Sequence, residues 1–175
     1  QLNQDMVYPV SNKNKRERFT VFRRMRSLQK KYSLYVQTYF IACNIYDIIL
    51  YKNKKFVFGK SNNFLANVFM YMASKFEDVQ QLSIYRIVES EEEKKEMILF
   101  ESKAFEMLEF KIPYVTTFLF LKQFLELVIY FHGKLEENPK KVKYLQKMLF
   151  ENHIHSPKPS YNAIHILSKT IYLSI

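Results

Sequence analysis

Two charged residues, Lys75 and Glu101, lie in segments of the sequence that are otherwise apolar. Lys75 ends the apolar run that starts at Met70, and Glu101 follows 26 residues later within the apolar stripe of a second predicted helix. Charged side chains are seldom buried without a partner. Their placement therefore indicates a contact with something outside the chain. From the residues alone, an internal salt bridge is the simpler alternative.

Candidate catalytic and metal-binding residues are few. Cys43, the only cysteine, lies in an apolar run with no histidine nearby in the sequence, which predicts a buried, inert thiol. His153 and His155 stand two residues apart beside a proline-containing loop, with no further ligand evident, and this makes a poor zinc site. His132 and His165 are interpreted as ordinary surface or half-buried residues. We therefore expect no enzymatic activity, no metal site and no cofactor.

The composition also excludes nucleotide-binding loops. The 175 residues include only two glycines, Gly59 and Gly133, so neither a G-x-G-x-x-G nor a Walker-type loop can be built. With 48% hydrophobic residues, 13 Tyr and 16 Phe, the chain can bury a substantial core as one domain or two small ones. We expect a globular, all-α protein.

The sequence favours an intracellular protein. A single cysteine forms no internal disulfide, which is typical of a reducing compartment such as the nucleus or cytoplasm. The apolar run at 39–51 is shorter than the ~20 residues that span a bilayer, and Asn44 and Asp47 interrupt it, so no membrane association is expected. No secretion signal is visible. The chain starts with Gln1 rather than Met, which is consistent with a removed N-terminal region.

The net charge of +10 has several possible meanings. Basic residues gather near the N-terminus, at Lys13, Lys15, Arg16, Arg18, Arg23, Arg24, Arg26, Lys30 and Lys31. A run of this kind is most simply the solvated face of a helix. It also suits an acidic protein partner, and clustered cations can bind nucleic acid by displacing counterions from phosphates.

Apolar residues at helical spacing predict five helices in the first two thirds of the chain. The predicted segments are 15–31, 36–50, 62–76, 82–88 and a fifth helix ending near 109. The second is apolar almost all round, which is typical of a central helix. Ser61 or Asn62 is predicted to cap the third helix, and Ser90 with Glu93 forms a capping box before the fifth. Residues 52–60 are predicted to form a turn.

Pro113 interrupts this pattern and marks a domain boundary. Three more helices are predicted after it, at about 115–131, 138–152 and 161–173. The expected organisation is an N-terminal extension at 1–14, a five-helix unit at 15–112 and a partial second helical lobe at 113–175.

Four segments, in this order, resemble motifs of the cyclin family. Asn44 to Leu50 is similar to the family's N-Y-x-D-x-(F/L)-L helix, and Ala73 to Glu77 reads A-S-K-F-E, as in its A-S-K-(F/Y)-E signature. Glu101 to Phe110 resembles the E-x-x-(I/V)-L-x-x-L-x-F helix, and Thr116 to Leu119 resembles the opening of the family's second lobe. The resemblance implies a cyclin box at 15–112, followed by a partial C-terminal cyclin fold.

The resemblance also implies a function and roles for individual residues. A cyclin binds and allosterically activates a cyclin-dependent protein kinase as a heterodimer, and the motifs are closest to the cell-cycle branch. Lys75 and Glu101 would lie side by side and hydrogen-bond the kinase backbone, and Phe64 would belong to the same contact surface. Arg18 and Asp47 would form an internal ion pair.

The sequence departs from the family at the patch that docks hydrophobic substrate motifs. Alignment through Arg18 puts Glu17, Thr20, Val21 and Arg24 at the patch positions, and Arg24 takes the place of a tryptophan. We expect hydrophobic docking to be lost and a basic groove to prefer acidic or phosphorylated segments.

The main alternative is a cyclin-fold transcription regulator, either a transcriptional cyclin or an adaptor of the general-transcription-factor type that binds DNA and protein. The basic first helix favours this alternative. The retained Lys75 and Glu101, together with the short second lobe, favour the kinase partner, so nucleic acid is not the expected ligand.

Overall fold

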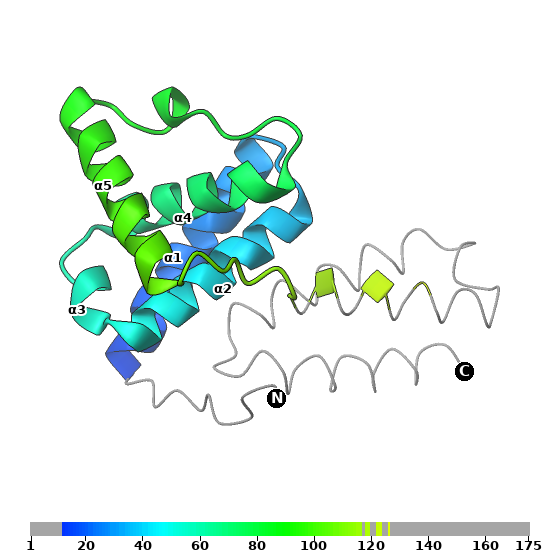
Figure 1. Cartoon of the computed structure of the whole chain (residues 1–175), viewed down its shortest axis with the longest axis horizontal. Coiled ribbons are helices and arrows are strands. Elements are labelled where there is room, and N and C mark those ends of the chain that lie inside the picture. Colours follow the sequence, from blue (N-terminus) through cyan, green and yellow to red (C-terminus); the bar gives the residue numbers. More distant parts are fainter. Residues whose placement is uncertain (1–11, 117, 120–121, 124–125, 127–175) are drawn as a thin grey trace. The chain divides into compact units, whose positions relative to one another are not determined.

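The computed structural model describes residues 12–116, 118–119, 122–123 and 126. These residues form helices and loops without any strand (Figure 1). The elements are α1 (Asn12–Lys31), α2 (Val36–Lys52), α3 (Lys54–Val57), α4 (Asn62–Glu77), the 3-10 helix η1 (Ile84–Arg86) and α5 (Glu91–Met107). The predicted all-α class and five-helix cyclin-like fold are confirmed.

The chain divides into two compact units. One comprises Arg16–Thr116, and the other comprises residues 1–15 with 117–175. The predicted boundaries after residues 14 and 112 stay predictions. The helices predicted after residue 113 lie outside the described residues, apart from 118–119, 122–123 and 126, which are helical.

The centre of the Arg16–Thr116 unit is the packing of α2 against α4, and α5 contacts both of these helices. α2 is apolar almost all round, so it can be stable only where other helices cover it. Small residues at the contact allow the two backbones to approach closely. Ala42, Ala66, Ala73 and Ser74 are all completely buried.

Aromatic rings join four helices through the core. Phe22 of α1 meets Tyr46 of α2 edge to face, with 5.6 Å between ring centroids. Tyr46 meets Phe69 of α4 at 5.7 Å, and Phe69 meets Phe100 of α5 at 5.8 Å, again edge to face. Such geometries add to the free energy of area burial. This continuous ring network joins α1, α2, α4 and α5 in one packed core.

The helix starts follow the predicted capping chemistry. Of the two candidate caps for α4, Ser61 is the one used, because its hydroxyl accepts a hydrogen bond from the Phe64 N–H at 3.1 Å. Ser90 caps α5 by accepting from the Glu93 N–H, also at 3.1 Å. The Glu93 carboxylate reaches back to the N–H of Glu89, one residue before the cap position.

The structure differs from the predicted elements at two places. The predicted turn at 52–60 contains the short helix α3, because the Asn53 side chain accepts from the Phe56 N–H and Val57 is buried. The helix predicted at 82–88 is only the three-residue η1. Its outer positions instead serve tertiary contacts, such as the hydrogen bond from the Asn67 amide to the Ile87 carbonyl at 2.9 Å.

Candidate functional site

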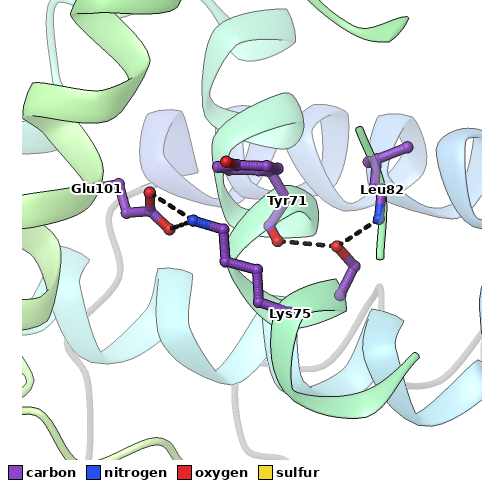
Figure 2. A network of polar contacts seen from close by, with 5 residues as sticks. Tyr71, Lys75, Leu82 and Glu101 are labelled. Atoms are coloured by element: carbon purple, nitrogen blue, oxygen red, sulfur yellow. Dashed lines mark hydrogen bonds and ion pairs between the residues drawn. The ribbon is translucent and has the colours of Figure 1, made fainter. Parts of the chain in front are cut away.

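Lys75 and Glu101 form an ion pair across the seam between α4 and α5. The Lys75 ammonium donates to both carboxylate oxygens of Glu101, at 2.8 and 2.9 Å (Figure 2). Lys75 lies in the last turn of α4, where a cation also interacts favourably with the helix dipole. Charge-assisted hydrogen bonds of this length belong to the strong class.

The pair is neither fully exposed nor sealed. The Lys75 side chain is 28% exposed and the Glu101 side chain is 10% exposed. The ammonium also lies 4.1 Å from the centroid of the Tyr71 ring, one helical turn earlier. Burial acts to lower the pKa of Lys75, but the interactions with Glu101 and Tyr71 outweigh it and raise that pKa. Lys75 therefore stays charged, and its side chain stays partly accessible to solvent.

The end of α4 that carries Lys75 is held by a buried serine. The Ser74 hydroxyl donates to the Tyr71 carbonyl at 2.9 Å and accepts from the Leu82 N–H at 3.0 Å (Figure 2). Ser74 and Leu82 are both buried, so this hydroxyl supplies an acceptor to an N–H that is shielded from water. This role of Ser74 joins groups eight residues apart and is not predicted by a local sequence pattern.

Asp78, which the sequence patterns also did not predict as a site residue, connects the C-terminal end of α4 to α2. Its carboxylate accepts from the Tyr35 N–H at 2.7 Å and from the Thr38 hydroxyl at 2.6 Å. Tyr35 is the N-cap position of α2 and makes no side-chain cap of its own. Asp78 thus satisfies the start of α2 from outside that helix, which no local sequence pattern reveals.

Arg18 and Asp47 form the second ion pair, between α1 and α2. Two hydrogen bonds of 2.8 Å join the guanidinium to the two carboxylate oxygens. Their side chains are 8% and 15% exposed, and the guanidinium lies 4.0 Å from the centroid of the Phe22 ring. Burial acts to lower the pKa of Arg18, but the hydrogen bonds and charge of Asp47 outweigh it and raise that pKa.

The chain is similar to a known protein family. A family model described as the cyclin N-terminal domain matches residues 2–113. The chain belongs to the cyclin family. Proteins with this domain are typically non-catalytic regulatory subunits, and a protein kinase is their general class of partner. No match was found among curated proteins or among solved structures.

The third predicted kinase-binding residue, Phe64, is buried in this cyclin-family chain. It is 6% exposed and meets Phe100 edge to face at 5.4 Å. Exposed apolar area beside the ion pair comes from other residues instead. Phe76 is 46% exposed and packs on Phe105 at 5.8 Å, and Ile98 is 46% exposed one turn before Glu101.

The four positions of the predicted docking patch separate into two groups. Thr20 and Arg24 are exposed and Glu17 is half-buried, so these three face or approach solvent. Val21 is completely buried in the core and cannot line a docking surface, which corrects the prediction for this residue. The reason is helical geometry, because Val21 shares the inner face of α1 with Phe22.

Other chemistry at described residues is limited. Cys43 is free and completely buried, 3.9 Å from the Met25 sulfur, and burial raises the pKa of its thiol. Within residues 12–116 and the few described later ones, no group of three or more His, Cys, Asp or Glu could hold a metal ion. No described helix is long and apolar enough to cross a bilayer. The four histidines lie outside the described residues.

Proposed function

We propose that this chain binds a cyclin-dependent protein kinase and activates it allosterically, as the regulatory subunit of a heterodimer in cell-cycle control. The observation that carries the proposal is the partly exposed pair of Lys75 and Glu101, held between two helices of a rigid unit. An intracellular location, nuclear or cytoplasmic, is part of the proposal and rests on the single buried cysteine.

The pair can supply hydrogen bonds to a partner's main chain. An ammonium has three N–H donors, and Glu101 accepts from Lys75 through two contacts. The remaining donor can meet a partner carbonyl, and each carboxylate oxygen keeps a lone pair for a partner N–H. Because the two side chains already hold each other, little conformational entropy is lost when the partner binds.

Apolar residues beside the pair can supply the burial that such an interface needs. Ile98 lies three residues before Glu101 on α5, and Phe105 lies four residues after it, so all three share one face of the helix. Phe76 adds an exposed ring from α4, in contact with Phe105. Apolar side chains around a few charged anchors are typical of specific protein interfaces.

The mechanism is a population shift in the kinase. A protein kinase needs its strand lysine paired with the glutamate of its regulatory helix before the ATP phosphates are correctly positioned. A partner that binds that helix more tightly in the competent position shifts the equilibrium toward it. The aromatic network through α1, α2, α4 and α5 suits this role, because the presented surface has to stay rigid.

Two double variants test the proposal. Lys75→Ala with Glu101→Ala removes both charges together, so the fold keeps no unpaired buried ion. Lys75→Glu with Glu101→Lys keeps an ion pair but exchanges donor and acceptor. We expect both variants to weaken kinase binding by roughly 30-fold or more. At a concentration near the wild-type Kd, neither variant should then activate a purified cyclin-dependent kinase.

The matched control is Lys60→Ala with Glu96→Ala. This pair joins the turn just before α4 to α5, but its side chains are 38% and 46% exposed. We expect near-normal kinase activation from the control, and circular dichroism should show an unchanged helix content in all variants. Normal activation by the charge-exchanged variant would show that the pair is only an internal salt bridge, and the proposal would fail.

A transcription regulator that binds DNA is the second candidate, favoured by the exposed cations of α1. Such binding weakens steeply as salt rises, because each phosphate contact releases counterions. Measuring duplex DNA affinity between low and physiological salt, beside kinase affinity, separates the two functions. Tight, strongly salt-dependent duplex binding without kinase binding would favour the second candidate.

A further inference from the structure

The exposed positions of one face of α1 carry only cations and hydroxyls, with the half-buried Glu17 at its edge. We call the exposed residues of this helix from position 16 onward the basic face. They are Arg16, Thr20, Arg23, Arg24, Ser27, Lys30 and Lys31. At 3.6 residues per turn they cover about one third of the helix circumference. The opposite third is buried and includes Val21, Phe22, Met25 and Leu28.

The cations of the basic face form two rows with the hydroxyls between them. Arg16, Arg23 and Lys30 follow one another at intervals of seven residues, and so do Arg24 and Lys31. Seven residues are about two helical turns, so neighbouring cations within a row lie about 10 Å apart. Both rows together span about 22 Å along the helix.

These cations are available to a partner, and the Lys31 ammonium also lies 4.9 Å from the centroid of the Tyr32 ring. In the described part of the chain, none of the ion pairs involves Arg16, Arg23, Arg24, Lys30 or Lys31. The helix beneath them is fixed by its buried face and by the Arg18 pair with Asp47. A surface with a strong excess of positive charge attracts and orients segments of opposite charge.

We propose that the basic face binds an acidic, extended segment of the proteins that the bound kinase phosphorylates. This proposal rests on the proposed function and adds a class of substrate to it. In an extended or polyproline chain, every third residue recurs after about 9 to 10 Å. A segment with an acidic residue at every third position therefore matches the row of Arg16, Arg23 and Lys30.

Nucleic acid fits the same face less well. Along each strand of B-DNA a charge recurs every ~3.4 Å, about three times as densely as the cations in one row. Single strands are bound by a positively charged groove combined with aromatic side chains on which the bases stack. The positions between the rows are Thr20 and Ser27, so the basic face has no aromatic ring for stacking.

Peptide binding to the full chain tests this inference. The probe is a fluorescein-labelled peptide of about ten residues, with glutamate at every third position and proline or serine elsewhere, measured by anisotropy at about 0.15 M salt. The control peptide carries glutamine in place of glutamate. We expect the glutamate peptide to bind and the glutamine peptide to bind at least about tenfold more weakly.

Two matched variants locate the site. The triple variant Arg16→Gln, Arg23→Gln and Lys30→Gln removes one row, and we expect it to weaken binding of the glutamate peptide about tenfold. The control removes three exposed cations elsewhere, by Lys54→Gln, Lys55→Gln and Lys103→Gln. Equal weakening in both variants would mean a general charge effect and would overturn the proposal.

Two further outcomes would also overturn it. In the first, the chain binds a DNA duplex of about 20 base pairs more tightly than the glutamate peptide at the same salt concentration, and the triple variant binds that duplex more weakly. In the second, sedimentation equilibrium shows that the wild-type chain self-associates and that the triple variant does not. The basic face would then be occupied by a second copy of the chain.

Kinase assays separate failure of this inference from failure of the proposed function. The triple variant should activate the kinase normally on a substrate without an acidic segment. On a substrate with the glutamate segment, its KM should rise about tenfold at unchanged kcat. Activation with no preference for the acidic segment would refute the docking alone. Binding of the glutamate peptide without activation of any kinase would refute the proposed function instead.

Discussion

The ion pair of Arg18 and Asp47 allows a stability prediction that can be worked out from its geometry. Asp47→Ala leaves the guanidinium, which is 8% exposed, without the two 2.8 Å hydrogen bonds that neutralise it. Removal of one partner from a buried pair typically costs about 3 to 5 kcal/mol. The Phe22 ring, 4.0 Å from the guanidinium, recovers part of this by a cation–π contact. We therefore expect a loss of about 3 kcal/mol.

Replacing both residues of the pair should have a much smaller effect on stability. Arg18→Met with Asp47→Leu removes both charges and fills the space with apolar side chains. Apolar replacements of buried pairs are often neutral or stabilising, since the desolvation cost of both ions disappears. We expect the free energy of unfolding of the double variant to lie within about 1 kcal/mol of that of the wild type, and clearly above that of Asp47→Ala.

Urea denaturation followed by circular dichroism measures both effects. As a control, Glu96→Ala breaks the more exposed pair with Lys60 and should change stability far less. The reasoning would be refuted if Asp47→Ala unfolded with the same free energy as the wild type. It would also be refuted if the double variant were as unstable as the single one, because the loss would then come from packing rather than charge.

Two more predictions concern buried groups. Ser74→Ala leaves the Leu82 N–H without its 3.0 Å acceptor, so we expect a loss of about 1 to 3 kcal/mol in urea denaturation, and an unchanged free energy would contradict the assigned role. Burial raises the pKa of both Cys43 and Tyr46 above their ordinary values of 9.0 and 10.0. The unfolded chain therefore releases these protons first, and the free energy of unfolding should fall as pH rises above about 9 toward the higher folded-state pKa values. In Cys43→Ala with Tyr46→Phe this alkaline decline should be shallower, and an equally steep decline would assign it to other groups.

Local patterns in the sequence were sufficient for much of the fold. The helical spacing of apolar residues and the cap residues Ser61 and Ser90 predicted the four long helices α1, α2, α4 and α5 close to their observed limits. These features depend on contacts within a few residues, where sequence and geometry are directly linked. The motifs led to the family, which the match over residues 2–113 shows.

Other features could not be read from local patterns. The short helix α3 depends on Val57 being buried and on Phe56 stacking against Phe100, with 4.1 Å between ring centroids. The roles of Ser74 and Asp78 depend on backbone groups that are distant along the chain. Hydrogen bonds of this kind follow from where the helices pack, and the packing is a property of the whole unit.

The sequence by itself determined the helical class, the family and the charges that a partner could use, because composition, periodicity and motif order do not depend on packing. Only the tertiary structure decided how accessible those charges are. Packing of α4 against α5 brings Lys75 to 2.8 Å from Glu101 yet leaves the lysine 28% exposed. The packing of α4 against α5 also leaves Phe64 only 6% exposed, against Phe100, and Val21 on the inner face of α1 is completely buried in the core.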